Sequence, residues 1–368
     1  MRLVTSVTVL AAGALLAACA TVAAPPVPAP ASFDAARLSE HVRILSDDSF
    51  MGRGIATPAE DMVIRYLSEQ YAAAGFEPGG PDGAWTQDVT LNRFTASNIH
   101  AGVTVDGETI ALNQGQQITI STRLPADHVA IADAPLVFVG YGITAPERDW
   151  DDFKGTDVRG KVLVVLVNDA DFEEPALNTF NGRAMTYYGR WTYKYEEAAR
   201  QGAAGIIIVH ETGPASYGWT TVQNSWSGPQ FDIVRANPAA ERTAMEAWIQ
   251  RDVAVDLFQR AGLDFETLKA QARRRDFQPV QLTGARFSAS YDVATSRVTT
   301  HNVIARLPGT THPDESILYT GHWDHIGVGT PPMATPSSTG PSTTLPAPPA
   351  CWSWRGCGGR DRVPNVPS

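Results

Sequence analysis

The sequence has very few cysteines and a deficit of positive charge. Its three cysteines are at positions 19, 351 and 357, so none lies between residues 20 and 350. That interval cannot form a disulfide within itself, and any metal bound there must be held by His, Asp or Glu. The formal net charge is −10, from 29 Lys and Arg against 39 Asp and Glu. Proteins that bind nucleic acid present a basic surface, so this balance argues against that class.

Length and composition are those of a globular protein. The 368 residues suffice for two ordinary domains. With 43% hydrophobic and 18% charged residues, the chain can bury sizeable cores, which separates it from disordered and fibrous proteins.

The first residues have the pattern of an export signal. Arg2 precedes an apolar run, Val4 to Ala18, that is too short for a membrane-spanning helix. The run ends in Leu-Ala-Ala-Cys19, which resembles a bacterial lipobox; an ordinary small-residue cleavage site is the alternative. We expect residues 1–19 to be a lipoprotein signal peptide, Cys19 to be lipidated, and the Ala/Pro-rich residues 20–32 to be a tether. This predicts an exported protein on the periplasmic face of a bacterial membrane, with the outer membrane as the expected one.

Residues 33–76 predict two helices. The second has a strong start signal: Thr57 as the cap, Pro58 at the first helical position, and Glu60 to complete a capping box. Gly75 is placed to end this helix. The charged stretch 47–54 between the two helices is interpreted as a solvated loop.

Strand patterns alternate with helical patterns along the rest of the chain. Residues 77–133 have a β pattern, with turns at residues 81–83 and at Asp106-Gly107. Further along, the pattern predicts strands at 136–139, 161–167 and 204–209, a helix at 193–203, two helices within 237–275, and strands again at 287–307. The strand at 161–167 is almost wholly apolar, which predicts burial on both faces.

Residues 315–327 combine an apolar run with groups that bind metals or move protons. Ile317, Leu318 and Tyr319 predict a buried strand, and His322 and Asp324 follow where that strand would end. In open α/β sheets, sites form at the carboxyl ends of strands. In a His-x-Asp motif the imidazole can bind a metal while the carboxylate holds its other ring N–H. A hydrogen-bonded histidine at a strand end fits the same residues.

The order of several motifs resembles the co-catalytic zinc exopeptidases, a family that includes aminopeptidase Y, bacterial leucyl aminopeptidases, glutamate carboxypeptidase and the catalytically silent transferrin receptor. Residues 302–309 (N-V-I-A-R-L-P-G) and 317–325 (I-L-Y-T-G-H-W-D-H) resemble the entry to its catalytic domain. Residues 135–210 resemble a protease-associated domain, which many members carry as an insert. The resemblance covers about residues 35–332.

The resemblance implies an α/β fold: an incomplete zinc-exopeptidase sandwich, with a mixed sheet flanked by helices and an inserted β-rich α+β protease-associated domain. It implies an N-terminal part of the peptidase domain at 33–115, the insert at 116–290 and the start of the catalytic domain at 291–332. Residues 333–368 have the composition of a disordered tail.

The resemblance also implies the site. His322 would bind one of two zinc ions, and Asp324 would be the carboxylate that orients His322. In the family the two metals activate a bridging water, and a glutamate takes the water's proton. The implied reaction is removal of N-terminal residues from peptide substrates. The bridging Asp, the Glu-Glu pair with its general base, and the remaining ligands should follow Pro332, and this sequence lacks them.

The sequence after Pro332 departs from the family in a particular way. Back-translating residues 333–355 and shifting the frame by one base permits D-G-D-A-I-F-N-G-A-V-D-N-A-T-G-T-A-G-L-L-E-L-A, which contains the missing N-G-A-V-D-N-A-T-G segment. Many third bases are free, but the Gly after the Met333 codon and the Leu at both Trp codons are forced. We therefore expect a one-base frameshift near Pro332; a natural Pro/Thr-rich tail is the alternative.

Two functions follow as expectations. The first is a zinc aminopeptidase lineage whose chain, as written, has too few ligands for activity. The second is a non-catalytic protease-associated-domain scaffold, as in the transferrin receptor. If strands expected after residue 332 are missing, the apolar stretch 317–319 would be left uncovered. The sequence sets no oligomeric state.

Overall fold

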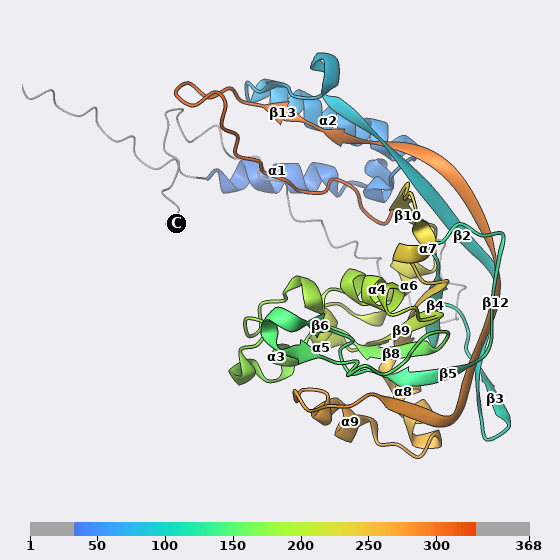
Figure 1. Ribbon diagram of the computed structural model, residues 1–368. Coiled ribbons are helices and arrows are strands. Elements are labelled where there is room, and N and C mark those ends of the chain that lie inside the picture. Colours follow the sequence, from blue (N-terminus) through green and yellow to red (C-terminus); the bar gives the residue numbers. More distant parts are fainter. Residues whose placement is uncertain (1–32, 329–368) are drawn as a thin grey trace, which may run out of the picture.

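Two long strands connect a pair of N-terminal helices to a larger α/β unit (Figure 1). The computed structural model describes residues 33–328. The helices are α1 (Ala35–Leu45) and α2 (Pro58–Ala73), separated by the short 3-10 helix η1 (Asp48–Arg53). The long strands are β2 (Thr86–Val105) and β12 (Val280–Val303), which pair antiparallel from Thr86↔Val303 to Val105↔Ala285. No helix within residues 33–328 is long and apolar enough to cross a membrane.

Most strands belong to one mixed sheet, in the order β10-β2-β12-β5-β8-β9-β11-β4, with β3 paired to β2. Strands β5, β8, β9 and β11 run parallel to one another, and the other pairings are antiparallel. With helices on both faces, this sheet confirms the predicted α/β class. The strands not yet located are β3 (Glu108–Ala111), β4 (Ile118–Ser121), β5 (His128–Phe138), β8 (Val162–Leu166), β9 (Gly205–His210), β10 (Gln230–Ile233) and β11 (Met245–Gln250).

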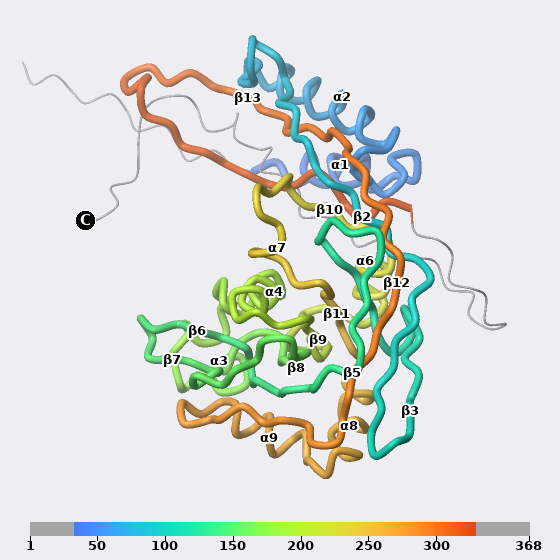
Figure 2. The backbone as a smooth tube through the Cα atoms, turned by 45° about the vertical axis from the view of Figure 1, so that its right-hand side comes forward, coloured from blue at the N-terminus to red at the C-terminus, as the bar shows by residue number. Residues whose placement is uncertain are grey.

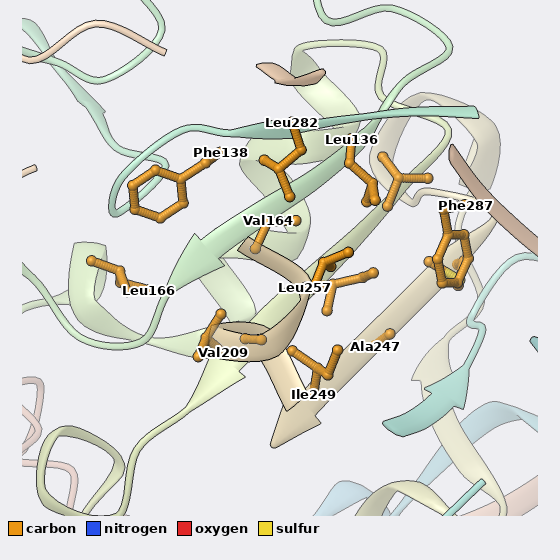
Figure 3. Close-up of a cluster of buried hydrophobic side chains, with 14 of the residues drawn as sticks. Leu136, Phe138, Val164, Leu166, Val209, Ala247, Ile249, Leu257, Leu282 and Phe287 are labelled. Atoms are coloured by element: carbon orange, nitrogen blue, oxygen red, sulfur yellow. The ribbon is translucent and has the colours of Figure 1, made fainter. Parts of the chain in front are cut away.

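The parallel strands are buried on both faces, as the apolar run at 161–167 predicted. All five residues of β8 are buried, and they alternate between two hydrophobic clusters. Val164 and Leu166 join the cluster covered by α8 (Arg251–Arg260) and α9 (Phe265–Gln271), where Leu257 packs (Figure 3). Leu163 and Val165 join the cluster covered by α4 (Trp191–Arg200) and α6 (Trp219–Trp226). We call residues 113–282, which contain these layers, the central unit.

Besides four further 3-10 turns, the described chain contains several smaller elements. They are β1 (Glu77–Pro78) paired with β13 (Ala305–Arg306), β6 (Thr144–Ala145) paired with β7 (Trp150–Asp151), and the short helices α3 (Ala170–Glu173), α5 (Thr212–Ala215) and α7 (Pro238–Glu241). The turn at Asp106-Gly107 joins β2 to β3 as predicted, with positive φ at both residues.

The two helices predicted within 237–275 are confirmed as α8 and α9, but the same range also contains strand β11, which was not predicted from the sequence. Its sequence, Met-Glu-Ala-Trp-Ile-Gln, contains good helix formers, but it lies between β9 and β4 and its first five residues are buried. Sheet pairing therefore overrides the local preference. The buried Glu246 is paired with Arg123.

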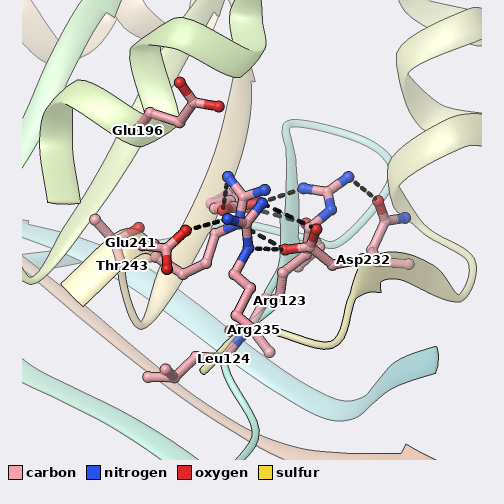
Figure 4. A network of polar contacts seen from close by, with 12 residues as sticks. Arg123, Leu124, Glu196, Asp232, Arg235, Glu241 and Thr243 are labelled. Carbon is pink, nitrogen blue, oxygen red and sulfur yellow. Dashed lines mark hydrogen bonds and ion pairs between the residues drawn. The ribbon is translucent and has the colours of Figure 1, made fainter. Parts of the chain in front are cut away.

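A network of arginines and carboxylates ties β10 to other parts of the central unit (Figure 4). Asp232 of β10 accepts hydrogen bonds from Arg235 and Arg242, each at 2.8 Å from its Oδ2. Arg123 donates to Gln230 of β10 at 2.9 Å and also contacts Glu246 of β11. Because β10 pairs with residues 91–94 of β2, the network fixes an inner stretch of the long two-stranded ribbon against the rest of the central unit.

Helix α2 lies where it was predicted, but its cap differs. Pro58 is its first residue, and Gly75 follows its end with a positive φ. The predicted capping box is wrong, because the Thr57 side chain caps no backbone N–H and instead donates to the Gly54 carbonyl at 2.6 Å. Glu60 accepts from the N–H of Ala56 at 2.6 Å rather than from that of Thr57.

Candidate functional site

The segment that carries the predicted metal ligand follows β13 and returns alongside α1 (Figures 1 and 2). The predicted buried strand at 317–319 is wrong. Ile317, Leu318 and Tyr319 are 61%, 83% and 57% exposed, and no helix or strand is formed from Leu307 to Val328. A strand is stable only when a neighbour pairs with its backbone. No described strand pairs with residues 317–319, so their apolar side chains stay in solvent.

Residues 323–327, by contrast, dock firmly on the loop between the two N-terminal helices. The Arg53 Nε donates to the Trp323 carbonyl at 2.9 Å, and the guanidinium also donates to the Leu45 carbonyl. The His325 N–H donates to the Arg53 carbonyl at 2.9 Å, and the Gly327 N–H to the Gly52 carbonyl at 3.0 Å. The loop predicted to be solvated therefore contains a buried arginine that binds the candidate ligand segment.

The indole of Trp323 anchors the same segment to the hydrophobic cluster of the N-terminal helices. It packs against a cluster formed by Phe50, Val63 and Leu67. Its Nε1 donates to the His301 carbonyl at 3.0 Å, which links the segment to the end of β12. Docking therefore joins three parts of the chain that are distant in sequence.

Glycine is required where the two backbones meet. Gly52 has φ +62°, and a Cβ added there would lie 2.5 Å from the Gly327 carbonyl oxygen. A Cβ at Gly54 would lie 3.2 Å from the Gly327 Cα. The pattern Gly-Arg-Gly at 52–54 was the sequence signal for this close approach, and the interpretation of the loop as solvated missed it.

Glu60 fixes α2 to the end of β12. Its Oε1 accepts three hydrogen bonds, each 2.8 Å long, from the Thr300 hydroxyl, the His301 N–H and the His301 Nδ1. The side chain is 4% exposed. Sequence reasoning assigned Glu60 a local capping role, because the partner strand lies far along the chain.

His322 and Asp324 do interact, although the closest contact differs from the predicted one. The Nδ1 of His322 lies 2.9 Å from the Asp324 main-chain carbonyl oxygen and 3.4 Å from its carboxylate. Both contacts involve Nδ1, so Nε2 of the imidazole is left for another partner. The His322 side chain is 64% exposed. The arrangement is compatible with a histidine ligand oriented through its other ring nitrogen.

His325 has a different environment. Burial lowers the pKa of its imidazole, and the positive charges of Arg53 and His322 lower it further, while Asp324 opposes the shift. The neutral form, which is the form that binds metals, is therefore favoured. Yet residues 33–328 contain no group of three or more His, Cys, Asp or Glu side chains that could hold a metal ion. The candidate ligand His322 and its partner Asp324 are brought together, but no third ligand joins them within that range.

Cys19, the predicted lipidation site, and the sequence after Pro332 lie outside the described residues.

Comparison with known proteins finds peptidases among solved structures, all at low similarity. An aminopeptidase from Aneurinibacillus sp. strain AM-1 matches at 17% identity and a TM-score of 0.36, over 77% of this chain and 50% of that one. A peptidase M28 precursor from Shewanella amazonensis SB2B matches at 16% identity and 0.36, over 78% and 54%. The zinc aminopeptidase BSAP from Bacillus subtilis matches at 13% and 0.33, over 76% and 48%.

The chain thus spans about half the length of these solved structures. At such low scores the likeness assigns no function. Neither a family model nor a curated protein matches the sequence.

Proposed function

We propose that this chain belongs to the lineage of zinc aminopeptidase-type hydrolases, which remove N-terminal residues from peptides. The observation that carries the proposal is the docked segment at 322–327. His322 is held at Nδ1 by Asp324 with Nε2 left over, and Arg53, Trp323 and Gly52 fix the backbone on either side. A metal ligand needs to be held in a fixed orientation in this way, whereas a residue of a solvated loop does not.

The chain as written does not supply the whole site. A two-zinc centre needs several carboxylates and imidazoles. The described residues offer His322 with Asp324, and residues 329–368 add Asp361, Cys351 and Cys357 but no histidine and none of the family's glutamates. Because these residues do not fit two zinc ions, we propose that this chain has no peptidase activity.

A shifted reading frame accounts for the missing ligands. The segment N-G-A-V-D-N-A-T-G, permitted one base out of step after Pro332, supplies the carboxylate that the family places between its metals. The exposed Ile317 and Leu318 are consistent with a sheet whose other strands are not encoded in this frame. The coding DNA from codon 325 onward tests this. If its shifted frame does not continue into a Glu-Glu pair, an Asp and a His, the frameshift proposal fails.

Calorimetric zinc titration and a peptidase assay test the function itself. The chain as written should neither bind two zinc ions at micromolar affinity nor release amino acid from an aminoacyl p-nitroanilide. The same chain with the frame restored should do both, and His322→Ala should abolish both in the restored chain. Binding of two zinc ions by the chain as written would refute the proposed incompleteness.

A scaffold role is the second candidate, favoured by the central unit, whose parallel strands are buried between two hydrophobic clusters. It predicts tight peptide binding without metal, measurable in the same calorimeter. For either role we propose that Cys19 carries a lipid that holds the protein on the periplasmic face of a bacterial membrane. Metabolic labelling with a palmitate analogue, lost in Cys19→Ser, tests the anchor.

A further inference from the structure

Strand β11, one of the parallel strands of the central unit, ends at a pocket that the proposed function does not use. The pocket has a volume of about 380 Å³ and is lined by residues that include Gln117, Trp219, Gln223, Gln250 and Asp252. Gln250 is the last residue of β11, and Asp252 lies in the first turn of α8. Ligands of α/β sheets bind beyond the carboxyl ends of parallel strands, and small-molecule sites start at about 300 Å³. Position and size both suit a small ligand.

Several side chains at this pocket keep hydrogen-bonding capacity. Among the described residues, the Gln223 amide has no hydrogen-bond partner. Gln117 uses its Oε1 to accept from the Asn113 N–H at 2.9 Å, which leaves its NH₂ group. Gln250 donates to the Gln116 carbonyl at 2.5 Å, which leaves its Oε1. The Oδ1 of Asp252 accepts a hydrogen bond from the Val253 N–H at 2.9 Å, which leaves Oδ2 to accept from a ligand. The pocket therefore offers donors and acceptors together.

Trp219 gives the pocket a fixed aromatic wall. Its Nε1 donates to the Gly115 carbonyl at 3.1 Å, so the indole is held in orientation. Gly115 has φ +78°, and a Cβ there would come within 3.4 to 3.6 Å of Ser227 and Gln223. Glycine is favoured at this position by its backbone conformation, because the contacts of an added Cβ would be of ordinary van der Waals length.

The lining excludes most ligand classes. It contains no Lys, Arg or His, so phosphates and carboxylates would find no countercharge. Trp219 is its single large apolar side chain, and the apolar surface that it offers is too small to bind a lipid chain. A peptide strand could not add to the neighbouring edge strand β4, because β4 is buried and the Gln114 amide already accepts from the Ile120 N–H at 2.7 Å and donates to its carbonyl at 3.1 Å.

We propose that this pocket binds a neutral saccharide. Sugar hydroxyls both donate and accept, which matches side-chain amides and one carboxylate, and the C–H face of a pyranose ring fits against the π face of an indole. The site is independent of His322 and of the reading frame, so it holds for the chain as written.

Ligand-observed NMR on the full chain tests the proposal with a panel of glucose, galactose, N-acetylglucosamine, maltose and cellobiose. At least one should bind with a millimolar Kd. Trp219→Ala and Gln223→Ala should each weaken binding by roughly tenfold, the loss of one well-placed contact of about 1.4 kcal/mol. Gln278→Ala, at an exposed glutamine outside the pocket, should leave the affinity unchanged.

Three results would overturn the proposal. The first is no signal from any saccharide of the panel at tens of millimolar. The second is binding that is indifferent to Trp219→Ala and Gln223→Ala, which would place the sugar elsewhere. The third is a Gln223-dependent signal from acetyl-Ala-Ala-amide with none from the sugars, which would make the pocket a peptide site. Because Gln223 is partly exposed and its side chain makes no hydrogen bond within the described chain, its alanine variant is expected to fold.

Discussion

Glu60 and His301 are joined by two hydrogen bonds of 2.8 Å, from the backbone N–H and the ring Nδ1 of His301 to one carboxylate oxygen. The same oxygen accepts from Thr300, and the other accepts from Ala56. A helix near the start of the described chain is thereby fixed to the strand that leads to the candidate ligand segment. The stability of this junction should depend on Glu60 more than on any local helix contact.

We expect Glu60→Gln to destabilise the protein by about 2 kcal/mol, because an amide nitrogen cannot accept the bonds that one carboxylate oxygen now accepts. Glu69→Gln, on an exposed position of the same helix, is the control and should change stability by less than about 0.5 kcal/mol. Urea unfolding followed by circular dichroism measures both. Equal effects of the two substitutions would show that the junction contributes nothing beyond helix propensity.

Gly52→Ala should release the docked segment. The added methyl would overlap the Gly327 carbonyl, since its carbon would lie 2.5 Å from that oxygen. Amide hydrogen exchange at His325 and Gly327 should rise by at least about tenfold, which corresponds to roughly 1.4 kcal/mol of lost docking. Gly83→Ala is the matched control, because Gly83 also has a positive φ (+73°) but nothing within 4 Å of an added Cβ. Unchanged exchange in Gly52→Ala would mean that the segment is not docked in solution.

Leu318→Asp distinguishes an exposed segment from a buried strand. With Leu318 83% exposed, the substitution should alter the unfolding free energy by less than about 0.5 kcal/mol while reducing aggregation, because it interrupts an apolar surface. Light scattering on concentration and urea unfolding measure the two effects. Leu67→Asp, at a buried position of α2, should instead unfold the N-terminal helices. A large loss of stability in Leu318→Asp would restore the predicted buried strand.

Residues 317–319 show which part of the fold can be predicted from the sequence and which part cannot. The strands β8 and β9 were predicted from their apolar runs. The prediction is confirmed because residues that cover both faces of these strands lie within the described chain. The run at 317–319 has the same local pattern, yet remains exposed because a pattern specifies what a segment would bury, not whether a neighbour exists. Strand β11 shows the reverse case, where tertiary pairing makes a strand from good helix formers.

The candidate site divides in the same way. His322 and Asp324 were found from their spacing, because two residues of one short segment interact locally. Arg53, Glu60 and His301 were missed, since their roles are contacts between segments far apart in sequence. Gly-Arg-Gly at 52–54 was the one local signal, and only the structure shows that it reflects an approach to Gly327.

His210 should make stability fall as the pH is lowered. Burial lowers the pKa of its imidazole below the ordinary value of about 6.5, against the raising effects of the Tyr217 carbonyl and Glu211. The unfolded chain then binds more protons than the folded one below pH 6.5, so stability is lost as the pH falls through the folded pKa.

The variant His210→Gln removes this titration and keeps a donor for the Tyr217 carbonyl, which lies 2.9 Å from Nε2. The melting temperature of the variant should fall less steeply than that of the wild type between pH 6.5 and 5. His41 and His325, whose pKa values are also lowered by burial, should leave part of the slope. Identical slopes in the two proteins would show that His210 does not contribute.

Asp232 should contribute far more to stability than exposed carboxylates do. Burial alone would raise the pKa of Asp232, but the hydrogen bonds from Arg235 and Arg242 outweigh it and lower the pKa. The Asp232 and Arg242 side chains are 9% and 8% exposed, and Arg235 is 17% exposed, so Asp232→Asn would leave the buried Arg242 and the half-buried Arg235 without their shared countercharge. We expect the free energy of unfolding to fall by about 3 kcal/mol.

Asp256→Asn is the control, because Asp256 pairs with Arg260 at the same 2.8 Å distance but is 53% exposed. This substitution should cost less than about 1 kcal/mol. Chemical unfolding at pH 7 measures both, and equal losses would show that the network in Figure 4 contributes no more to stability than a surface ion pair.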